Sequence, residues 1–201
     1  MRWADGRRYT GEWSDNRCNG RGLLQYKDGR RYEGEYMQDK MHGKGVYEWS
    51  EGARYMGQYR DHRKHGVGIM TWKTGGRYDG DYEDDKMTGF GMMTWADGRR
   101  YEGAWLEGRC TGFGSTSFKS GSRYVGNYVC DKMEGRGSYT FADGRRYEGE
   151  YQSNQKHGRG AYMWTDGVTF SGIWNKGTPV SGILLFAGGL VALMQSSPAD
   201  L

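Results

Sequence analysis

One motif recurs every 23 residues, eight times, in this chain. It consists of an aromatic residue, a glycine two positions later and a second aromatic residue two positions after the glycine. The eight first aromatic residues are Tyr9, Tyr32, Tyr55, Tyr78, Tyr101, Tyr124, Tyr147 and Phe170. A fixed period of this length is typical of stacked supersecondary units that share a continuous core, rather than of an ordinary globular domain. Because the same chemistry is spread evenly over eight copies, the repeat also favours a non-enzymatic protein.

Each 23-residue unit is predicted to be a β-hairpin followed by a turn. Tyr32, Gly34 and Tyr36 alternate with glutamates, and alternation at period two indicates a strand. A polar stretch, a second alternating segment and a glycine-containing turn complete the unit. At a strand spacing of ~4.8 Å, eight hairpins would extend over about 80 Å. The predicted fold is therefore an all-β, elongated, single-layer antiparallel β solenoid of 23-residue hairpin repeats, twisted into a rod.

Three kinds of glycine recur with the repeat. Gly34 lies between two rings on one strand face, so its missing side chain is expected to leave a slot over which a ring of a neighbouring unit can lie. The paired glycines of the second strand, such as Gly43 and Gly45, are expected to serve the same purpose, because glycine otherwise weakens a strand. Glycines late in each unit, such as Gly52, are expected to supply a positive φ in the turn.

The composition excludes several protein classes. A mean hydropathy of −0.95 fits a thin aromatic core better than a thick globular one, and an aromatic content of 15% argues against disorder. The net charge of +4 is interleaved along the chain, which predicts no nucleic-acid partner. Three cysteines without a signal peptide indicate a reducing, cytoplasmic setting. No window of eighteen apolar residues is present, so no membrane-spanning helix is predicted.

Short motifs within the units resemble those of the MORN-repeat family. They are Tyr-Glu-Gly-Glu-Tyr at 32–36 and 147–151, His-Gly-x-Gly at 42–45, 65–68 and 157–160, and Ala-Asp-Gly at 96–98 and 142–144. The resemblance implies an elongated antiparallel β array that serves as a scaffold or adaptor at membrane–cytoskeleton junctions, with phospholipid binding ascribed to the repeats. The chain is most similar to the protist MORN scaffold proteins built almost only of repeats, which are dimers.

Three regions are predicted along the chain. Residues 1–8 are interpreted as the tail of a preceding repeat, because Trp3 falls in the column of tryptophans that end other units, and a fragment of a longer array would begin in this way. Residues 9–177 are interpreted as seven full repeats and the start of an eighth. Residues 178–201 are interpreted as a C-terminal cap and dimerisation segment, because Pro179 cannot donate to a strand ladder.

An apolar segment near the C-terminus is predicted to form a hairpin around Gly188 and Gly189. This hairpin either caps the last repeat or exposes part of its apolar surface to make a twofold homodimer, and the two roles are compatible. We favour dimerisation through the C-terminal half. The expected interface comprises Ile183, Leu184, Leu185, Phe186, Leu190, Val191, Leu193 and Met194.

Pairs of arginines are candidates for binding anionic phospholipid. The candidate residues are Arg30, Arg31, Arg99 and Arg100. Guanidinium groups grip phosphates well, but Glu or Asp lies close by in most units, and cross-strand pairing with these acids is the simpler expectation. A weak attraction to anionic membranes remains open as a second interaction.

A structural zinc site is a further candidate, although no cofactor is expected otherwise. Cys130, Asp131 and His157 belong to the same edge in adjacent units, and all three residue types are zinc ligands. No spacing typical of zinc motifs supports the site. If it exists, it would pin the homodimer near the C-terminus.

The rings and glycines together suggest a binding groove. The candidate groove residues are Tyr32, Tyr36, Tyr55, Tyr59, Tyr78, Tyr82, Tyr101, Trp105, Tyr124 and Tyr128. The preferred hypothesis is a dimeric, non-enzymatic scaffold in the cytoplasm, at a cytoskeletal or membrane-apposed structure, with cytoskeletal proteins as partners. The alternatives are a peripheral phosphoinositide-binding module and an adaptor that holds a partner helix in the aromatic groove.

Overall fold

The computed structural model describes residues 1–189 and 191–195, and in these residues the chain is all-β. The strands are β1 (Arg8–Ser14), β2 (Arg17–Gln25), β3 (Arg31–Met37), β4 (Lys40–Glu48), β5 (Arg54–Arg60), β6 (Arg63–Thr71), β7 (Arg77–Glu83), β8 (Lys86–Thr94), β9 (Arg100–Leu106), β10 (Arg109–Ser117), β11 (Arg123–Val129), β12 (Lys132–Thr140), β13 (Arg146–Gln152), β14 (Gln155–Met163), β15 (Thr169–Asn175), β16 (Thr178–Leu185) and β17 (Val191–Gln195).

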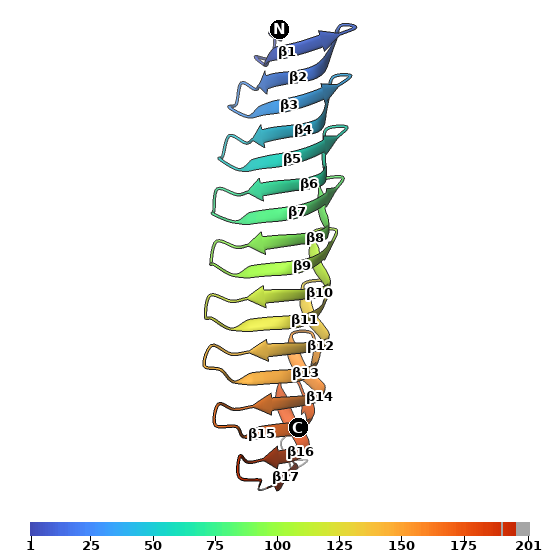
Figure 1. The fold of residues 1–201 in the computed structure, drawn as a ribbon. Coiled ribbons are helices and arrows are strands. Elements are labelled where there is room, and N and C mark those ends of the chain that lie inside the picture. The colour runs from blue at the N-terminus through green and yellow to red at the C-terminus, as the bar shows by residue number, and fades with distance from the viewer. Residues whose placement is uncertain (190, 196–201) are drawn as a thin grey trace. The chain divides into compact units, whose positions relative to one another are not determined.

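All of these strands belong to one open sheet, in which successive hairpins follow one another along the chain (Figure 1). Neighbours pair antiparallel, as in β3 with β4 and β4 with β5. The predicted single-layer antiparallel array of hairpin repeats is therefore confirmed. Within the described residues, no helix is long and apolar enough to cross a membrane.

The chain divides into two compact units, each built from the same hairpins. The first unit comprises Met1–Ala96 with Trp105–Gly108, and the second comprises Asp97–Ala104 with Arg109–Leu201. In each unit the register repeats with the sequence. For example, Gly34 pairs with Gly45 in the first unit, and Gly149 pairs with Gly160 in the second.

Two kinds of turn connect the strands. Within a hairpin, two residues with positive φ join the strands, such as Gln38 (49°) and Asp39 (69°), which is the geometry of a type I′ turn. Between hairpins, a longer connection contains a glycine with positive φ, as at Gly52, whose N–H donates to the carbonyl of Trp49 at 3.0 Å. The seven turn glycines at this position have φ between 86° and 96°, so their predicted role is confirmed.

The core is a file of aromatic rings on one side of the sheet, which we call the ring face. The eight first aromatic residues of the repeats are all fully buried. Tyr32 makes edge-to-face contacts with Tyr36 of its own strand and with Tyr59 of the next hairpin, both with centroids 5.2 Å apart. Such contacts stabilise by about 0.5–1.5 kcal/mol each beyond the area that they bury. The same arrangement repeats in the second unit, as in Tyr124 with Tyr128 and Tyr151.

The glycines at Gly34 and Gly45 make room for a ring, but for a different ring from the one that we expected. Tyr32 lies over the two glycines of its own hairpin, and its hydroxyl donates to the carbonyl of Glu35 at 3.0 Å. A Cβ at Gly34 would lie 2.6 Å from the Tyr32 oxygen. The prediction of a neighbouring unit's ring was therefore wrong in this detail, because the hydrogen bond folds each tyrosine back along its own strand.

The first glycine of each pair has another role than the one that we predicted. Gly43 has a φ of 58°, and the register with β3 shifts there, so that Gly34 pairs with Gly45 but Glu35 pairs with His42. This glycine therefore forms a bulge in the second strand, where a left-handed residue is needed. Only the second glycine of the pair lies beneath a ring.

Both ends of the described chain continue the repeat pattern. At the N-terminus, the Trp3 N–H donates to the carbonyl of Arg7 at 3.0 Å, as Trp49 does to Ala53. At the C-terminus, β16 is the second strand of an eighth hairpin, in which Gly182 pairs with Gly172 beside the Phe170 ring. The boundary that we predicted between residues 177 and 178 therefore falls inside a hairpin turn.

Candidate binding groove

The ten aromatic residues that we predicted to line a groove are core residues. Tyr32 is 0% exposed and Tyr36 is 6% exposed, and the other eight are also buried. Because these rings fill the ring face with one another, no partner helix can lie among them. The prediction that a binding groove lies among these aromatic rings was therefore wrong.

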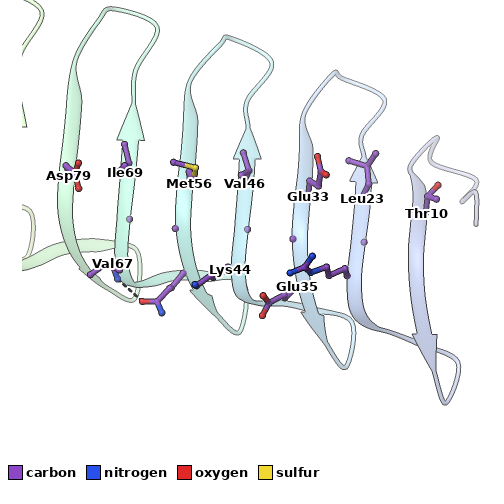
Figure 2. A pocket seen from close by; sticks show the side chains of 17 residues that line it. Thr10, Leu23, Glu33, Glu35, Lys44, Val46, Met56, Val67, Ile69 and Asp79 are labelled. Carbon is purple, nitrogen blue, oxygen red and sulfur yellow. Dashed lines mark hydrogen bonds between the residues drawn. The ribbon is translucent and has the colours of Figure 1, made fainter.

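A groove is present on the opposite side of the sheet, which we call the open face. It has a volume of about 1060 Å³ and belongs entirely to the first unit (Figure 2). Its lining residues are Thr10, Arg21, Gly22, Leu23, Glu33, Gly34, Glu35, Lys44, Gly45, Val46, Met56, Gly57, Gln58, Val67, Gly68, Ile69 and Asp79. Backbone lies between two rows of side chains, because the intervening glycines, such as Gly34 and Gly45, belong to the ring face.

One of the two rows of side chains lies nearer to the turns between hairpins, and its central side chains are apolar. Figure 2 shows Val46, Met56 and Ile69 side by side on β4, β5 and β6. Val46 pairs with Met56, and Met56 pairs with Ile69, so the three side chains occupy consecutive strands on one face. Glu33 on β3 and Asp79 on β7 flank this apolar strip. The apolar strip thus lies between two carboxylates, and the groove continues beyond Glu33 to Leu23 and Thr10.

The second row, on the other side of the glycines, presents the residue between the paired glycines. The Gln58 side-chain oxygen accepts a hydrogen bond from the Val67 N–H at 2.9 Å, which holds the bulge in β6 in place (Figure 2). Asp81 does the same for Phe90 at 2.9 Å. Val67 in the groove and Phe90 beyond it are 60% and 58% exposed, whereas Arg21 and Lys44 occupy this position in the first two bulges. The second row of the groove is therefore mostly polar.

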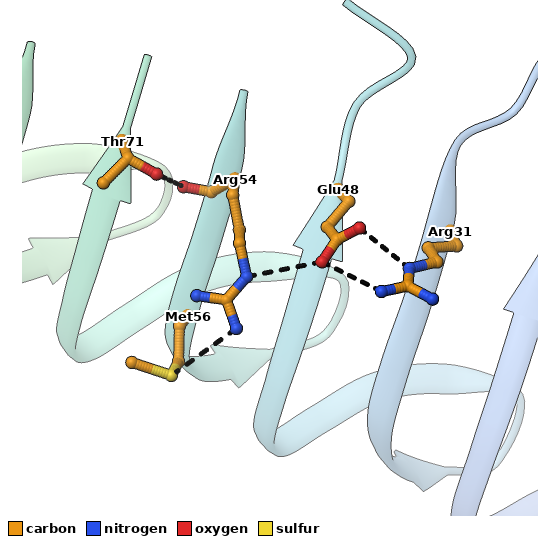
Figure 3. Close-up of polar contacts among 5 residues, drawn as sticks. All are labelled: Arg31, Glu48, Arg54, Met56 and Thr71. Carbon is orange, nitrogen blue, oxygen red and sulfur yellow. Dashed lines mark hydrogen bonds and ion pairs between the residues drawn. The ribbon is translucent and has the colours of Figure 1, made fainter. Parts of the chain in front are cut away.

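A charged cluster borders the groove. Glu48 on β4 accepts from Arg31 at 2.8 Å and pairs with Arg54 at 3.4 Å, while Arg54 also contacts the Met56 sulfur (Figure 3). The hydrogen bond from Arg31, followed by the charges of both arginines, lowers the pKa of the Glu48 carboxyl. The cluster thus contacts the apolar strip at Met56, its central residue.

Three of the arginines proposed for lipid binding are already paired with acids. Arg30 bonds Asp28 at 2.8 Å, Arg31 bonds Glu48 at 2.8 Å, and Arg100 bonds Glu102 at 3.2 Å. The fourth, Arg99, donates its backbone N–H to Asp97 at 2.9 Å. Of these three ion pairs, only Arg31 with Glu48 is the cross-strand pairing that we expected, whereas Arg30 and Arg100 pair with acids two residues away in the sequence.

The C-terminal hairpin carries an apolar surface. Ile183 pairs with Leu193 and Leu185 pairs with Val191, so these four side chains share one face of β16 and β17, and all are exposed. Leu193 is 81% exposed, and Phe186 at the turn is 38% exposed. Leu184 is half-buried on the opposite face, paired with Phe170. Leu190 and the side chain of Met194 lie outside the described part of the structure.

The three proposed zinc ligands are not brought together as a cluster. Cys130 and Asp131 are the two residues of a hairpin turn. The Asp131 carboxylate accepts from the Cys110 N–H at 2.8 Å, so it is turned toward the preceding hairpin. His157 lies in β14, paired with Glu150. Among the described residues no group of three or more His, Cys, Asp or Glu side chains is arranged to hold a metal ion.

The family of the chain follows from the repeats. The model of the MORN repeat matches seven segments, residues 9–30, 32–54, 55–77, 78–99, 101–123, 124–145 and 147–169. The chain belongs to the MORN-repeat family. These seven segments begin at or near the first strands of the first seven hairpins, so each MORN repeat here is one hairpin with its closing turn. No curated protein sequence matches the chain.

Solved structures show the same kind of fold at low sequence identity. The MORN-repeat chain is similar to the TCP10 domain of Danio rerio CPAP, with a TM-score of 0.55 and 12% identity over 97% of this chain and 92% of that chain. A second similar structure is the Drosophila melanogaster SAS-4 TCP domain in complex with a proline-rich motif of Ana2, with a TM-score of 0.49 and 10% identity over 77% of this chain and 85% of that one. The first likeness shows a shared fold alone, and the second is too distant to carry a functional argument.

The aromatic repeat predicted a groove on the ring face and not the groove on the open face. The sequence nevertheless contains a signal for the open-face groove. Leu23, Val46 and Ile69 recur at the period of the repeat, one residue after the paired glycines, at positions that alternate away from the rings. Alternation places them on the face opposite the rings.

Proposed function

We propose that this MORN-repeat protein is a non-enzymatic scaffold that binds a partner protein in the open-face groove of its first four repeats. The observation that carries the proposal is the groove itself, an apolar strip of Val46, Met56 and Ile69 flanked by the carboxylates of Glu33 and Asp79. The MORN-repeat family membership of the chain is consistent with a repeat scaffold.

The occupant that fits this groove is an amphipathic helix. Neighbouring strands are ~4.8 Å apart, so Val46, Met56 and Ile69 are spaced close to the 5.4 Å rise of one helical turn. Apolar residues at i, i+3 or i+4, and i+7 of a partner would therefore meet one strand each. Basic residues beyond both ends of the apolar stripe would meet Glu33 and Asp79. This is the adaptor hypothesis, placed on the other face of the sheet.

Peptide display against the full chain tests the proposal. A library of peptides about 16 residues long, enough for four helical turns, would be selected on the wild-type protein and counter-selected on Met56→Glu. We expect enriched sequences with an apolar helical stripe and basic ends, which bind the Met56→Glu variant at least tenfold more weakly. Met37→Glu is the control, because Met37 is 46% exposed and lies outside the groove. Enrichment of peptides that bind both variants equally would contradict the proposal.

Homodimerisation through the C-terminal hairpin is part of the proposed function. Ile183, Leu185, Val191 and Leu193 form an exposed apolar cluster that would be removed from water in a twofold pair. Light scattering at tens of micromolar protein should give twice the chain mass, and Leu193→Lys should give the chain mass. A wild-type protein that is monomeric under these conditions would overturn the dimer.

For its cellular place, we propose the cytoplasm, at a cytoskeletal or membrane-apposed structure, with cytoskeletal proteins as partners. A peripheral phosphoinositide-binding module is the alternative, but the ion pairs of Arg30, Arg31 and Arg100 argue against specific lipid recognition. Sedimentation with vesicles that contain phosphoinositide separates the two. Binding that disappears at physiological salt indicates charge attraction alone, whereas binding that persists there supports the alternative.

A further inference from the structure

Lys156 has an unusual environment in the second unit. Its position on β14 is paired with Tyr151, so its side chain enters the ring face. The Nζ atom lies 4.5 Å from the centroid of Tyr162, 4.9 Å from Trp174, 5.2 Å from Tyr147 and 5.4 Å from Phe141. Cation–π contact with four rings attracts the ammonium group, but none of these rings carries a counter-charge.

An open cavity of about 410 Å³ adjoins this lysine. Its lining residues are Met133, Tyr139, Phe141, Tyr151, Asn154, Gln155, Lys156, Lys176 and Gly177. Tyr151 is 5% exposed, and its hydroxyl is buried without a hydrogen-bond partner. The hydroxyl of Tyr36, at the same repeat position, is likewise buried without a partner, so this feature is not peculiar to the cavity.

The same position four repeats earlier shows what Lys156 lacks. Lys64 also lies over rings, those of Trp49, Tyr55 and Tyr82 at 5.6–5.7 Å. The hairpin turn after Lys64 carries Asp84 and Asp85, and the Asp85 carboxylate accepts from the Lys64 N–H at 3.0 Å. In the turn after Lys156, the two corresponding residues are Lys176 and Gly177.

The loss of these two carboxylates leaves an uncompensated positive region. Burial lowers the pKa of Lys156, and the charge of Arg145 lowers it further, whereas Asp85 raises the pKa of Lys64 against the effect of burial. In the described part of the structure, Lys156 forms no ion pair with a carboxylate, and Lys176 adds a second cation beside the cavity. Lys156 is half-buried and lacks a carboxylate partner, so an anion entering the cavity would be attracted to its ammonium group.

We propose that this cavity binds a small aromatic carboxylate, whose carboxylate pairs with Lys156 and whose ring packs against Tyr139 and Phe141. The two rings are in tilted contact, with centroids 4.7 Å apart, and both line the cavity. An apolar wall with a few convergent polar groups is the usual make-up of a small-molecule site.

Calorimetric titration of the full chain with benzoate tests the site. Lys156→Met should weaken binding at least tenfold, and it should fold because methionine occupies this position in other repeats, as at Met41 and Met133. Lys64→Met is the matched control, with an affinity within twofold of wild type. Binding by Lys156→Met with wild-type affinity, or no heat with millimolar benzoate, overturns the proposal.

A second pair of variants separates charge from shape. Gly177→Asp restores the carboxylate that Lys64 has in Asp85 and should weaken benzoate binding at least fivefold. Gly177→Asn has the same size without the charge and should stay within twofold of wild type. A Cβ at Gly177 meets nothing within 4 Å, and aspartate and asparagine occupy this left-handed position in other repeats. Equal losses in both variants would overturn the ion-pair basis.

Two further ligands test the chemical class. Acetate has the carboxylate without the ring, and benzyl alcohol has the ring without the carboxylate. Both should bind at least tenfold more weakly than benzoate. Acetate binding as tightly as benzoate would overturn the aromatic part of the proposal, and benzyl alcohol binding as tightly would overturn the anionic part.

Discussion

At the scale of single residues, the fold depends on one tyrosine lying over two glycines in each hairpin. Tyr32 lies over Gly34 and Gly45, and its hydroxyl is held by the Glu35 carbonyl. Any side chain at the glycines would occupy the place of the ring. The recurrence of glycine in the middle of strands, which is unfavourable by itself, is explained by this contact.

Gly45→Ala tests this contact. The added Cβ would lie 2.5 Å from two ring carbons of Tyr32, so we expect a destabilisation of at least 1–3 kcal/mol, about the effect of overpacking a core. The urea midpoint of unfolding measures it. Gly188→Ala is the control, because a Cβ there meets nothing within 4 Å, and it should leave the midpoint unchanged. A Gly45→Ala variant as stable as wild type would show that the ring can move aside.

Lys64→Met tests the burial of a charged amine in the ring face. Burial lowers the folded-state pKa of Lys64 below its ordinary value of 10.5. The free-energy cost of burying the charged amine therefore applies in full at pH values below the folded pKa. This cost decreases as pH rises toward 10.5, because the folded protein releases the lysine proton at a lower pH than the unfolded protein does. We expect the methionine variant to be more stable than wild type at neutral pH, with an advantage that shrinks as pH rises.

Urea unfolding at several pH values from neutral to alkaline measures this difference, and Lys132→Met, at an exposed lysine, is the control. Ionisation of the tyrosines affects both proteins alike and cancels in the comparison. An advantage that is constant with pH would contradict the role of the buried charge.

At the scale of elements, each hairpin turn is tied to the hairpin before it. The second turn residue donates its N–H to a carbonyl of the preceding hairpin, as Asp131 does to Cys110 at 3.0 Å. The side chain of the turn residue also accepts a hydrogen bond from that hairpin, as Asp131 Oδ1 does from the Cys110 N–H at 2.8 Å. Asp39, Asp85 and Asn154 make the same side-chain bond. The eighth hairpin has Pro179 at the position where Cys18, Lys64, Cys110 and Met133 donate this N–H, so it lacks the donor.

Substitution of Asp131 tests this tie. Asp131→Gly keeps the left-handed turn, which Gly108 and Gly177 adopt natively, but removes the acceptor. We expect a loss of about 1–2 kcal/mol and faster amide exchange at Cys110. Asp131→Asn keeps an acceptor, as Asn154 does in the next repeat, and should stay within about 0.5 kcal/mol of wild type. Equal exchange at Cys110 in all three proteins would show that the tie does not contribute.

At the scale of the whole molecule, every hairpin packs mainly on its neighbours in the chain, as in other repeat proteins. Each unit therefore has a continuous file of rings rather than a central core. The groove of the first unit is lined by Leu23, Val46 and Ile69, which recur in one repeat column that holds Ser115 and Ser138 in the second unit. The cavity beside Lys156 adjoins a turn that lacks the aspartates of other repeats. Function in such an array is therefore expected where the repeats differ from one another.

The predicted rod is tested by small-angle scattering on the monomeric fraction. A compact globule of this length has a radius of gyration of about 16–17 Å. A rod of about 80 Å, the length that the strand spacing gives, has a radius of at least 23 Å. We expect the larger value, with the mass of the fraction measured by light scattering so that a dimer is not mistaken for an extended monomer. A radius near the globular value would contradict the rod.

Much of the fold could be predicted because local rules set it. Alternation at period two places Tyr32, Gly34 and Tyr36 on one face, and a turn glycine such as Gly52 requires a positive φ whatever the surroundings. These are properties of a few consecutive residues. The hairpins, their antiparallel order and the role of the turn glycines therefore followed from the sequence by itself.

The tertiary structure decided which groups meet across strands and repeats. The direction of the Tyr32 ring depends on a hydrogen bond to Glu35, and the bulge at Gly43 depends on the register with β3. The groove on the open face and the missing counter-ion of Lys156 likewise depend on residues that only strand pairing brings together. Sequence patterns determine the periodicity of each strand, whereas side-chain packing between strands determines which face is filled and which is left open for a partner.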